Sequence, residues 1–398
     1  MTEKPIIACV GSTRFGNHLE TSLGDLASEA IEAALSDAGL EANDLDCAFA
    51  SNSVAGVITG QEAVRGQVSF KKLPLGGIPV FNIENACASG STAVHLATNY
   101  LRGGAADVAL VVGYEKMVHE DKSVSFHALE TCSDIQEMAE IKAGLGPVAA
   151  KRSVFMDLYA QKVQKYLDST GATQRHLAQI AAKNSANGTR NPLAQFQKAN
   201  DTEAVLESRE IVAPLTLLMC SGLSDGAAAL ILLSQKFAKS RKISGPVIAG
   251  SAIASESFET DGSQMRRVSE AAYAQAGITP QDIDLAEVHD ATSPGELFAY
   301  EDLGLAEEGE GWKLVEDGTV FTGGRCPVNP SGGLLSRGHP IGATGVAQVC
   351  EIAQHLRGIA GERQVEGAQI GIAHCLGGQA SFGTTSGAAA MAATVVTA

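Results

Sequence analysis

The chain lacks the features of secreted, zinc-binding and membrane-spanning proteins. Its eight cysteines are scattered, with no Cys-x-x-Cys pair and no cysteine–histidine cluster at zinc spacing, so neither a disulfide framework nor a bound metal is expected. No apolar run reaches the ~18 residues of a membrane helix, and we expect no membrane contact. The first apolar run, residues 6–10, is shorter than the core of a signal peptide, so we expect a cytoplasmic protein.

Basic residues are also scarce. The chain has 29 Lys and Arg against 45 Asp and Glu, a formal net charge of −16. This balance argues against a nucleic-acid partner or an anionic membrane surface. With 45% hydrophobic and 19% charged residues, the 398-residue chain has the composition of a globular protein with two or three domains.

What the chain does contain is an internal repeat. Residues 38–50 and 276–288 align without a gap, and each copy is followed by strands that alternate with helices. Alternation of this kind is typical of α/β proteins, in which helices cover both faces of largely parallel sheets. The sequence therefore predicts an α/β fold built from two duplicated βαβ halves.

One segment interrupts this repeat. Residues 115–209 are richer in charged residues, Gln and Asn, and their apolar spacing predicts helices near 155–167 and 174–187. We interpret this segment as a cap inserted into the first half. The expected division is 1–114 for the first part of the N-terminal half, 115–209 for the cap, 210–243 for the return of that half, and 244–398 for the C-terminal half.

Cys87 lies at a predicted elbow between a strand over 78–83 and a helix whose apolar positions recur from Ala93 to Leu101. A helix N-terminus carries unpaired N–H groups and a partial positive charge, which favour a thiolate. Cys87 is therefore a candidate nucleophile. The alternative is a small buried cysteine that fills a tight turn.

Three polar clusters in the second half contain candidate partners of Cys87. His289 follows an apolar strand, His339 lies in a glycine-rich segment, and Cys375 lies at the end of the predicted strand, two residues beyond its 369–373 core. If the halves are related by a two-fold arrangement, these segments converge on the elbow. His374 alternates to the other face of its strand and is predicted to be structural.

Each candidate has a chemical and a structural interpretation. His339, between Gly338 and Pro340, is predicted to lie on an open backbone with little cover, where it could act as a general base; a surface-loop histidine is the alternative. Cys375 could exchange a proton with a carbon acid, or could be a buried strand cysteine. His289 could join the site, or could only bond Asp290.

Together these motifs resemble the thiolase superfamily. The elbow at residues 85–90 approximates the thiolase cysteine motif, and residues 338–340 and 375–377 match the Gly-His-Pro and Cys-x-Gly motifs. The resemblance to the sterol-carrier-protein X branch rests on further segments: Lys183-Asn184, residues 191–196, 214–216 and 224–228, and His289-Asp290, where ordinary thiolases carry an Asn-Glu pair.

One departure from that branch bears on the chemistry. The branch usually continues His-Asp-Cys-Phe and lacks a cysteine in the last motif, whereas this chain has Ala291 and Thr292 after Asp290 and a cysteine at Cys375. The second catalytic thiol is thus expected at the position that ordinary thiolases use.

The resemblance implies a thiolase fold with five layers, α-β-α-β-α, assembled as a homodimer or homotetramer. It implies an acyltransferase that cleaves a 3-oxoacyl-CoA, or condenses acyl-CoAs in reverse, through an acyl-cysteine on Cys87. His339 would act as base and Cys375 as acid. The oxyanion holes would use the N–H groups of Cys87 and Gly377, and His339 with His289. Coenzyme A would be a co-substrate, with no permanent cofactor.

Several alternatives stay open. A decarboxylating condensing enzyme of the same fold needs no second cysteine, and a retro-aldolase on CoA thioesters needs no nucleophilic one. An acyl-CoA-binding protein, or a subunit that depends on a small zinc-ribbon/OB-fold partner, is a further possibility. The acyl group could come from lipid or aromatic acid degradation, and the CoA-binding residues are not assigned. The cations that the cap offers for CoA phosphates are Lys183, Arg190, Lys198 and Arg209.

Overall fold

The computed structural model describes residues 3–75, 77–147, 152–257, 263–380 and 388–398. Among these residues, the main sheet contains strands β1 (Ile6–Ser12), β2 (Cys47–Ser51), β3 (Val80–Ile83), β4 (Val108–Glu115), β7 (Gly226–Leu233), β8 (Val247–Ser255), β9 (Leu285–Glu287), β10 (Ile370–Gly377) and β11 (Ala390–Thr397). A short ribbon of β5 (Glu210–Val212) and β6 (Leu215–Thr216) lies apart from it.

The strand order reveals two equivalent halves. It runs β3-β2-β4-β7-β1-β8-β11-β10-β9, and β1 meets β8 at one described pair, Ile6 with Val247. Read outward from this junction, both halves begin with an antiparallel pair and end with parallel strands. An isolated parallel bridge between Ala286 and Val328 continues the second half where β3 ends the first. The predicted duplication is confirmed.

Helices lie on both faces of each half. The first half carries α1 (Leu23–Ala38), α2 (Ala55–Thr59), α3 (Arg65–Ser69), α4 (Ser89–Arg102) and α10 (Gln235–Arg241). The second half carries α11 (Gln264–Ala276), α12 (Ser293–Asp302), α13 (Lys313–Glu316), α14 (Gly333–Ser336) and α15 (Ile341–Leu356).

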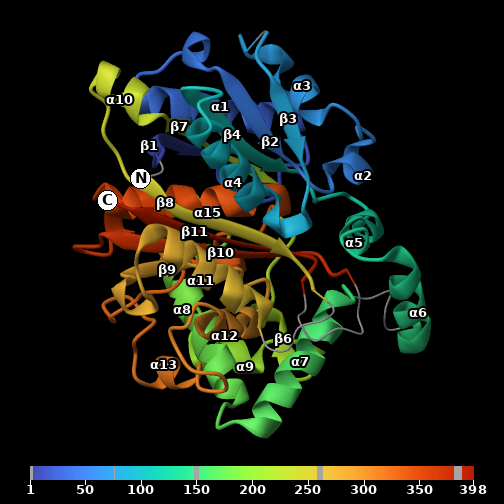
Figure 1. Ribbon diagram of the computed structural model, residues 1–398. Helices are drawn as coiled ribbons and strands as arrows, with labels where there is room; N and C mark the ends of the chain where they lie inside the picture. The colour runs from blue at the N-terminus through green and yellow to red at the C-terminus, as the bar shows by residue number, and fades with distance from the viewer. Residues whose placement is uncertain (1–2, 76, 148–151, 258–262, 381–387) are drawn as a thin grey trace.

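These helices and the two halves of the sheet form the five expected layers. Helices α4 and α15 pack on each other in one apolar core, which also contains side chains from the strands of both halves. The outer faces are covered by α1 on the first half and by α11 and α12 on the second. Figure 1 shows the first half in blue at the top, α15 across the middle, and the second half in orange and red below.

The repeat has a packing reason at the two equivalent strands β1 and β8. A Cβ atom on Gly11 would lie 2.3 Å from the carbonyl oxygen of Ala30 in α1, and one on Gly250 would lie 2.1 Å from that of Ala272 in α11. Both distances are too short for any side chain, so each strand requires glycine where its outer helix crosses.

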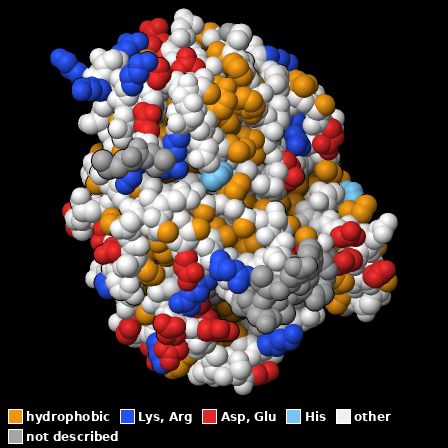
Figure 2. Space-filling model, in the orientation of Figure 1, with side chains coloured by type: hydrophobic (Ala, Val, Ile, Leu, Met, Phe, Trp, Pro, Cys, Tyr) orange, Lys and Arg blue, Asp and Glu red, His pale blue; other side chains and the backbone are white. Residues whose placement is uncertain are grey.

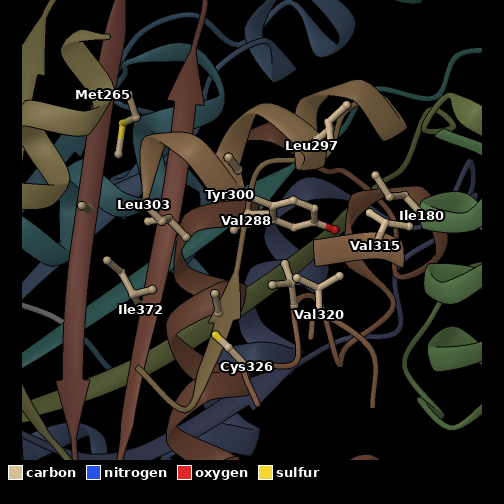
Figure 3. Packing of buried hydrophobic residues seen from close by; sticks show 14 of the residues in the cluster. Ile180, Met265, Val288, Leu297, Tyr300, Leu303, Val315, Val320, Cys326 and Ile372 are labelled. Carbon is tan, nitrogen blue, oxygen red and sulfur yellow. The ribbon is translucent and has the colours of Figure 1, made fainter. Parts of the chain in front are cut away.

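The cap helices are α5 (Lys122–Glu130), α6 (Ile135–Leu145), α7 (Phe155–Ser169), α8 (Gln174–Thr189) and α9 (Thr202–Glu207). We propose that residues 115–209 form an inserted cap, because β4, which ends at Glu115, and β7, which follows the segment, are antiparallel neighbours. Figure 3 shows Ile180 of cap helix α8 packed with Val315 and Tyr300 of the second half. The cap is therefore anchored to the second half by apolar contacts.

One strand boundary differs from the sequence expectation. The strand expected over 78–83 begins two residues later, at Val80, directly after Pro79, which has no N–H to donate. In the part of the chain that the structure describes, no helix is long and apolar enough to cross a membrane.

Candidate active site

The elbow at Cys87 has the geometry that the sequence predicted. A short 3₁₀ turn, η3 (Ala86–Ala88), leads from β3 into α4, and Ala86 has a positive φ of 49°. The side chain of Cys87 is partly buried at this turn. Alanine is neither β-branched nor bulky, so this left-handed backbone costs less at position 86 than it would with valine or isoleucine.

The end of β10 lies directly against the elbow. A Cβ atom on Gly377 would meet the carbonyl oxygen of Asn85 at 2.2 Å and the N–H nitrogen of Ala88 at 2.7 Å. The thiol of Cys375 donates a hydrogen bond to the carbonyl oxygen of Cys87 (S···O 3.0 Å). Glycine at position 377 therefore permits the two halves to meet where both cysteines lie.

The two predicted histidines complete a triangle with Cys87. The Sγ of Cys87 and one ring nitrogen each from His289 and His339 all lie within 4.8 Å of one another. The two imidazole rings meet edge to face, with centroids 5.1 Å apart and planes at 76°. The structure thus brings together the four side chains that the sequence singled out.

Thr344 defines the tautomer of His339. The Thr344 hydroxyl donates to the carbonyl oxygen of Pro340 (3.1 Å), one turn earlier in α15, and lies 2.8 Å from Nδ1 of His339. When the hydroxyl donates to Pro340, its oxygen accepts from Nδ1–H, and this tautomer of His339 leaves a free lone pair on Nε2. A histidine in this state is ready to accept a proton at Nε2.

His289 differs from His339 in having no partner for its ring. The residue is only 4% exposed, and neither of its buried ring nitrogens has a hydrogen-bond partner. Its backbone N–H donates to Nδ1 of His374 (3.4 Å), whose other ring nitrogen lies 3.7 Å from Asp302. His374 thus holds the backbone of His289 from the far face of β10.

Burial dominates the electrostatics of the site. It lowers the pKa of His339 to about 3, and lowers the pKa of His289 well below its usual range, with His339 and His374 adding to the effect. Burial raises the pKa of Cys375 to about 12. The resting site therefore contains neutral imidazoles and a protonated Cys375 thiol.

Two features of this environment differ from what the sequence suggested. Burial raises the pKa of Cys87 and opposes the thiolate that a helix N-terminus favours; Cys375 and Glu115 raise the pKa further, and the N–H of Gly378 opposes the shift. His339 does not lie on an open loop either, since it is 6% exposed and its backbone N–H donates a hydrogen bond to the hydroxyl oxygen of Ser224 (3.1 Å). Desolvation, which the local sequence does not reveal, outweighs the helix dipole.

Glu115 is a supporting residue that the sequence analysis missed. Its carboxylate accepts from the N–H groups of Ser53 (2.9 Å) and Ala55 (2.8 Å) at the start of α2, and from Gly342 (3.0 Å) at the start of α15. Burial raises its pKa to about 7, and these N–H groups oppose the shift. Glu115 therefore caps one helix of each half beside Cys87.

Tyr159 of α7 brings the cap to the site. Its ring lies near the backbone of His289, since a Cβ on Gly295 would be 3.7 Å from Cε1 of Tyr159 and 3.0 Å from the carbonyl oxygen of His289. Burial raises the pKa of the Tyr159 phenol, and Cys87 and Asp290 raise it further. No sequence motif pointed to this residue.

Asp290 serves a buried network behind His289 and does not bond its ring. Nδ2 of Asn184 donates to Asp290 (2.8 Å) and to Glu296 (2.6 Å), and Lys183 pairs with Glu296 at 2.7 Å. Lys183 is 5% exposed, so it is not an accessible cation for CoA phosphates. Arg190, Lys198 and Arg209 are exposed.

Two protein-family models match the chain. The model described as "Thiolase, N-terminal domain" matches residues 6–236, and the one described as "Thiolase C-terminal domain-like" matches residues 248–386. These matches coincide with the two structural halves and include all four side chains of the candidate site.

Curated relatives are similar over most of the chain. An "Acetyl-CoA acetyltransferase" of Methanothermobacter thermautotrophicus is 39% identical over 93% of this chain and 95% of its own length. The "Benzoylsuccinyl-CoA thiolase subunit BbsB" of Thauera aromatica is 34% identical, covering 95% and 96%. "Sterol carrier protein 2" of Bos taurus is 38% identical over 89% of this chain, which spans 66% of the bovine protein.

Solved structures share the fold. The "Ltp2-ChsH2(DUF35) aldolase" superposes with a TM-score of 0.78 at 23% identity, covering 100% of this chain and 98% of that one. Human mitochondrial 3-ketoacyl-CoA thiolase in complex with CoA superposes with a TM-score of 0.72 at 16% identity, again over 100% and 98%.

Proposed function

Since this chain belongs to the thiolase superfamily, in its sterol-carrier-protein X-like branch, and is an acyltransferase, we propose that it cleaves a 3-oxoacyl-CoA with coenzyme A, or condenses acyl-CoAs in reverse. One observation carries the proposal. The thiol of Cys375 donates to the carbonyl oxygen of Cys87, whose Sγ lies within 4.8 Å of His289 and His339. A nucleophile, a base and an acid thus share one site.

In the proposed first half-reaction, the sulfur of Cys87 attacks the 3-oxo carbon while Nε2 of His339 takes the thiol proton. A base with a free lone pair is needed because Cys87 rests as a thiol. The carbon–carbon bond then breaks, the electron pair passes to the CoA enolate, and Cys375 gives its proton to the enolate carbon. The products are acyl-Cys87 and the CoA thioester of the C1–C2 fragment, which is acetyl-CoA when C2 carries no substituent.

The second half-reaction restores both cysteines. The thiol of coenzyme A gives its proton to the Cys375 thiolate and attacks the acyl-Cys87 carbonyl. The Cys87 sulfur leaves and regains its proton from the His339 imidazolium. We propose that the N–H groups of Cys87 and Gly377 stabilise one oxyanion and that His339 and His289 stabilise the other, each donor contributing roughly 3 kcal/mol.

A decarboxylating condensing enzyme is a second candidate, favoured by the triangle of one cysteine and two histidines. It would use a malonyl-type thioester and would not need Cys375. Dependence of carbon–carbon chemistry on Cys375 would exclude it.

The assembly is also part of the proposal. Strand β3 is an edge of the sheet, and its Phe81 and the neighbouring Leu96 of α4 are 38% and 40% exposed. Figure 2 shows hydrophobic side chains gathered over this part of the molecule. Because exposed strand edges and apolar patches favour association, we propose a homodimer formed at β3, or a homotetramer built from it.

A small partner subunit of the zinc-ribbon/OB-fold type is a further part of the proposal. One relative is named as a subunit, and one structural neighbour is a complex with a DUF35 component. Purification from the native host would test this: a co-purifying small subunit supports it, and full activity of the chain alone contradicts it.

The experiment that tests the function is a substrate panel. Linear, branched and aromatic 3-oxoacyl-CoAs are incubated with the chain and coenzyme A, and products are identified by mass spectrometry. The proposal predicts that the shortened acyl-CoA forms only when coenzyme A is present, and that without it each chain releases at most one equivalent of the CoA thioester of the first half-reaction. Multiple turnovers without coenzyme A would contradict thiolysis.

A further inference from the structure

We propose that Cys87, His289 and His339 form a zinc-binding site at which Zn²⁺ reversibly blocks the nucleophile. The three ligand atoms come from the elbow before α4, the segment after β9 and the segment before α15, and they all lie within 4.8 Å of one another. Residues so far apart in the chain form no zinc motif, so their spacing in the sequence gave no sign of this site.

The triangle is close to the size that zinc requires. Tetrahedral zinc with Zn–S near 2.3 Å and Zn–N near 2.0–2.1 Å holds its ligand atoms roughly 3.3–3.6 Å apart. Side-chain rotations that draw the atoms together by about 1 Å would complete the site. One thiolate and two imidazoles are ligands that suit Zn²⁺, and the fourth position stays open for water.

His339 is already arranged as a zinc ligand. Its Nδ1–H is held by Thr344 (2.8 Å), so Nε2 is the nitrogen with a free lone pair. Histidines that bind metals almost always donate their other ring N–H in this way, which fixes both the ring and the tautomer.

His289 supplies an independent observation. It is 4% exposed, and both of its ring nitrogens lack a hydrogen-bond partner. A buried polar group without a partner is destabilising, and coordination of one nitrogen would recover part of that loss. The unpaired imidazole of His289 therefore favours a metal ion bound within the triangle.

Coordination is a simple exchange of a proton for the metal. The Cys87 thiol releases its proton to solvent as the S–Zn bond forms, and no electron is transferred. The bound zinc occupies both the sulfur and Nε2 of His339, so neither can take part in acylation. This inhibitory effect rests on the proposed function, whereas zinc binding itself does not.

The test uses the full chain, freed of metal and titrated with Co²⁺ as a spectroscopic substitute for Zn²⁺. The site predicts one equivalent of cobalt with a thiolate-to-metal charge-transfer band, which stoichiometric Zn²⁺ removes. Cys87→Ser should abolish the band. His289→Asn and His339→Asn should each weaken cobalt binding at least about tenfold, the smallest loss typical when a group that only supports a metal ligand is removed. An absent band, or an unchanged band in Cys87→Ser, would overturn the proposal.

Matched controls separate the triangle from general metal binding. Cys375→Ser removes the neighbouring thiol, which is outside the triangle, and His127→Asn removes an exposed histidine. Both variants should bind cobalt as the unmodified chain does, and loss of binding in either would contradict the assignment.

An activity measurement then distinguishes the two proposals. Zinc should inhibit turnover, and a chelator should restore it. A cobalt band in a chain that shows no turnover when metal-free would remove the proposed function and leave the zinc site. Full turnover in the presence of saturating bound zinc would remove the inhibitory role.

Discussion

The thiol of Cys375 donates a hydrogen bond to the backbone carbonyl oxygen of Cys87, with an S···O distance of 3.0 Å. The two residues belong to different halves of the duplicated fold, and β10 reaches the elbow because Gly377 has no side chain. The duplication therefore creates the candidate site: one half supplies Cys87, the proposed nucleophile, and the other supplies both histidines and the second thiol.

Replacing Cys375 with Ala should separate the two half-reactions. Acylation of Cys87 by acetyl-CoA should persist at a reduced rate, because His339 remains and water can protonate the leaving coenzyme A thiolate. Carbon–carbon cleavage should fall by about 10²–10⁴-fold, the range for loss of a general acid. Acyl transfer and cleavage are measured separately by mass spectrometry. Turnover within a few-fold of the unmodified chain would remove Cys375 from the proton transfer.

The pH dependence of alkylation tests the resting state of Cys87. Burial raises the pKa of Cys87, so the thiolate fraction at neutral pH is small and rises as pH increases. The rate at which iodoacetamide modifies Cys87 should therefore rise about tenfold per pH unit between pH 6 and 9. Site-specific modification is followed by peptide mass spectrometry. A rate that is flat across this window would indicate a thiolate already paired with an imidazolium.

Gly377→Ala should damage activity without unfolding the chain. The added Cβ would lie 2.2 Å from the Asn85 carbonyl oxygen, so the end of β10 must move away from the elbow. If one oxyanion donor is lost, turnover should fall roughly 10²–10³-fold. Gly144→Ala is the matched control, since nothing lies within 4 Å of its Cβ. Equal activity of both variants would contradict the close approach.

The buried Lys183–Glu296 pair should matter more for stability than an exposed pair. Lys183→Met leaves Glu296 as an uncompensated buried charge and should lower the free energy of unfolding by about 3–5 kcal/mol. The control is Arg175→Ala, which breaks an exposed pair with Glu203 and should cost less than about 1 kcal/mol. Urea unfolding measures both. Equal losses of unfolding free energy would show that the buried pair stabilises the chain no more than the exposed pair does.

The sequence predicted the fold well because its signals are local. Both repeats carry a helix that ends at a left-handed glycine, Gly39 (φ 63°) and Gly277 (φ 75°), followed by a 3₁₀ turn and a strand. These boundaries depend on neighbouring residues and can be read in order along the chain.

The environment of the site could not be predicted in the same way. The protonation of Cys87 and His339 follows from burial by both halves, and the Glu115 carboxylate bonds residues that are far apart in the sequence. Motifs pointed to the side chains that the structure brings together, but long-range packing determines their charge. The roles of Cys87, His339, Cys375 and His289 stay predictions until they are measured.

The most direct test of the account is intact-protein mass spectrometry after mixing the chain with acetyl-CoA, and separately with 3-oxoacyl-CoAs. The acyl-cysteine mechanism predicts one acyl adduct per chain, located on Cys87. The adduct should disappear when coenzyme A is added and should be absent from Cys87→Ala. An adduct that persists in Cys87→Ala, or substrate cleavage with no adduct on Cys87 under rapid quenching, would contradict the acyl-cysteine mechanism.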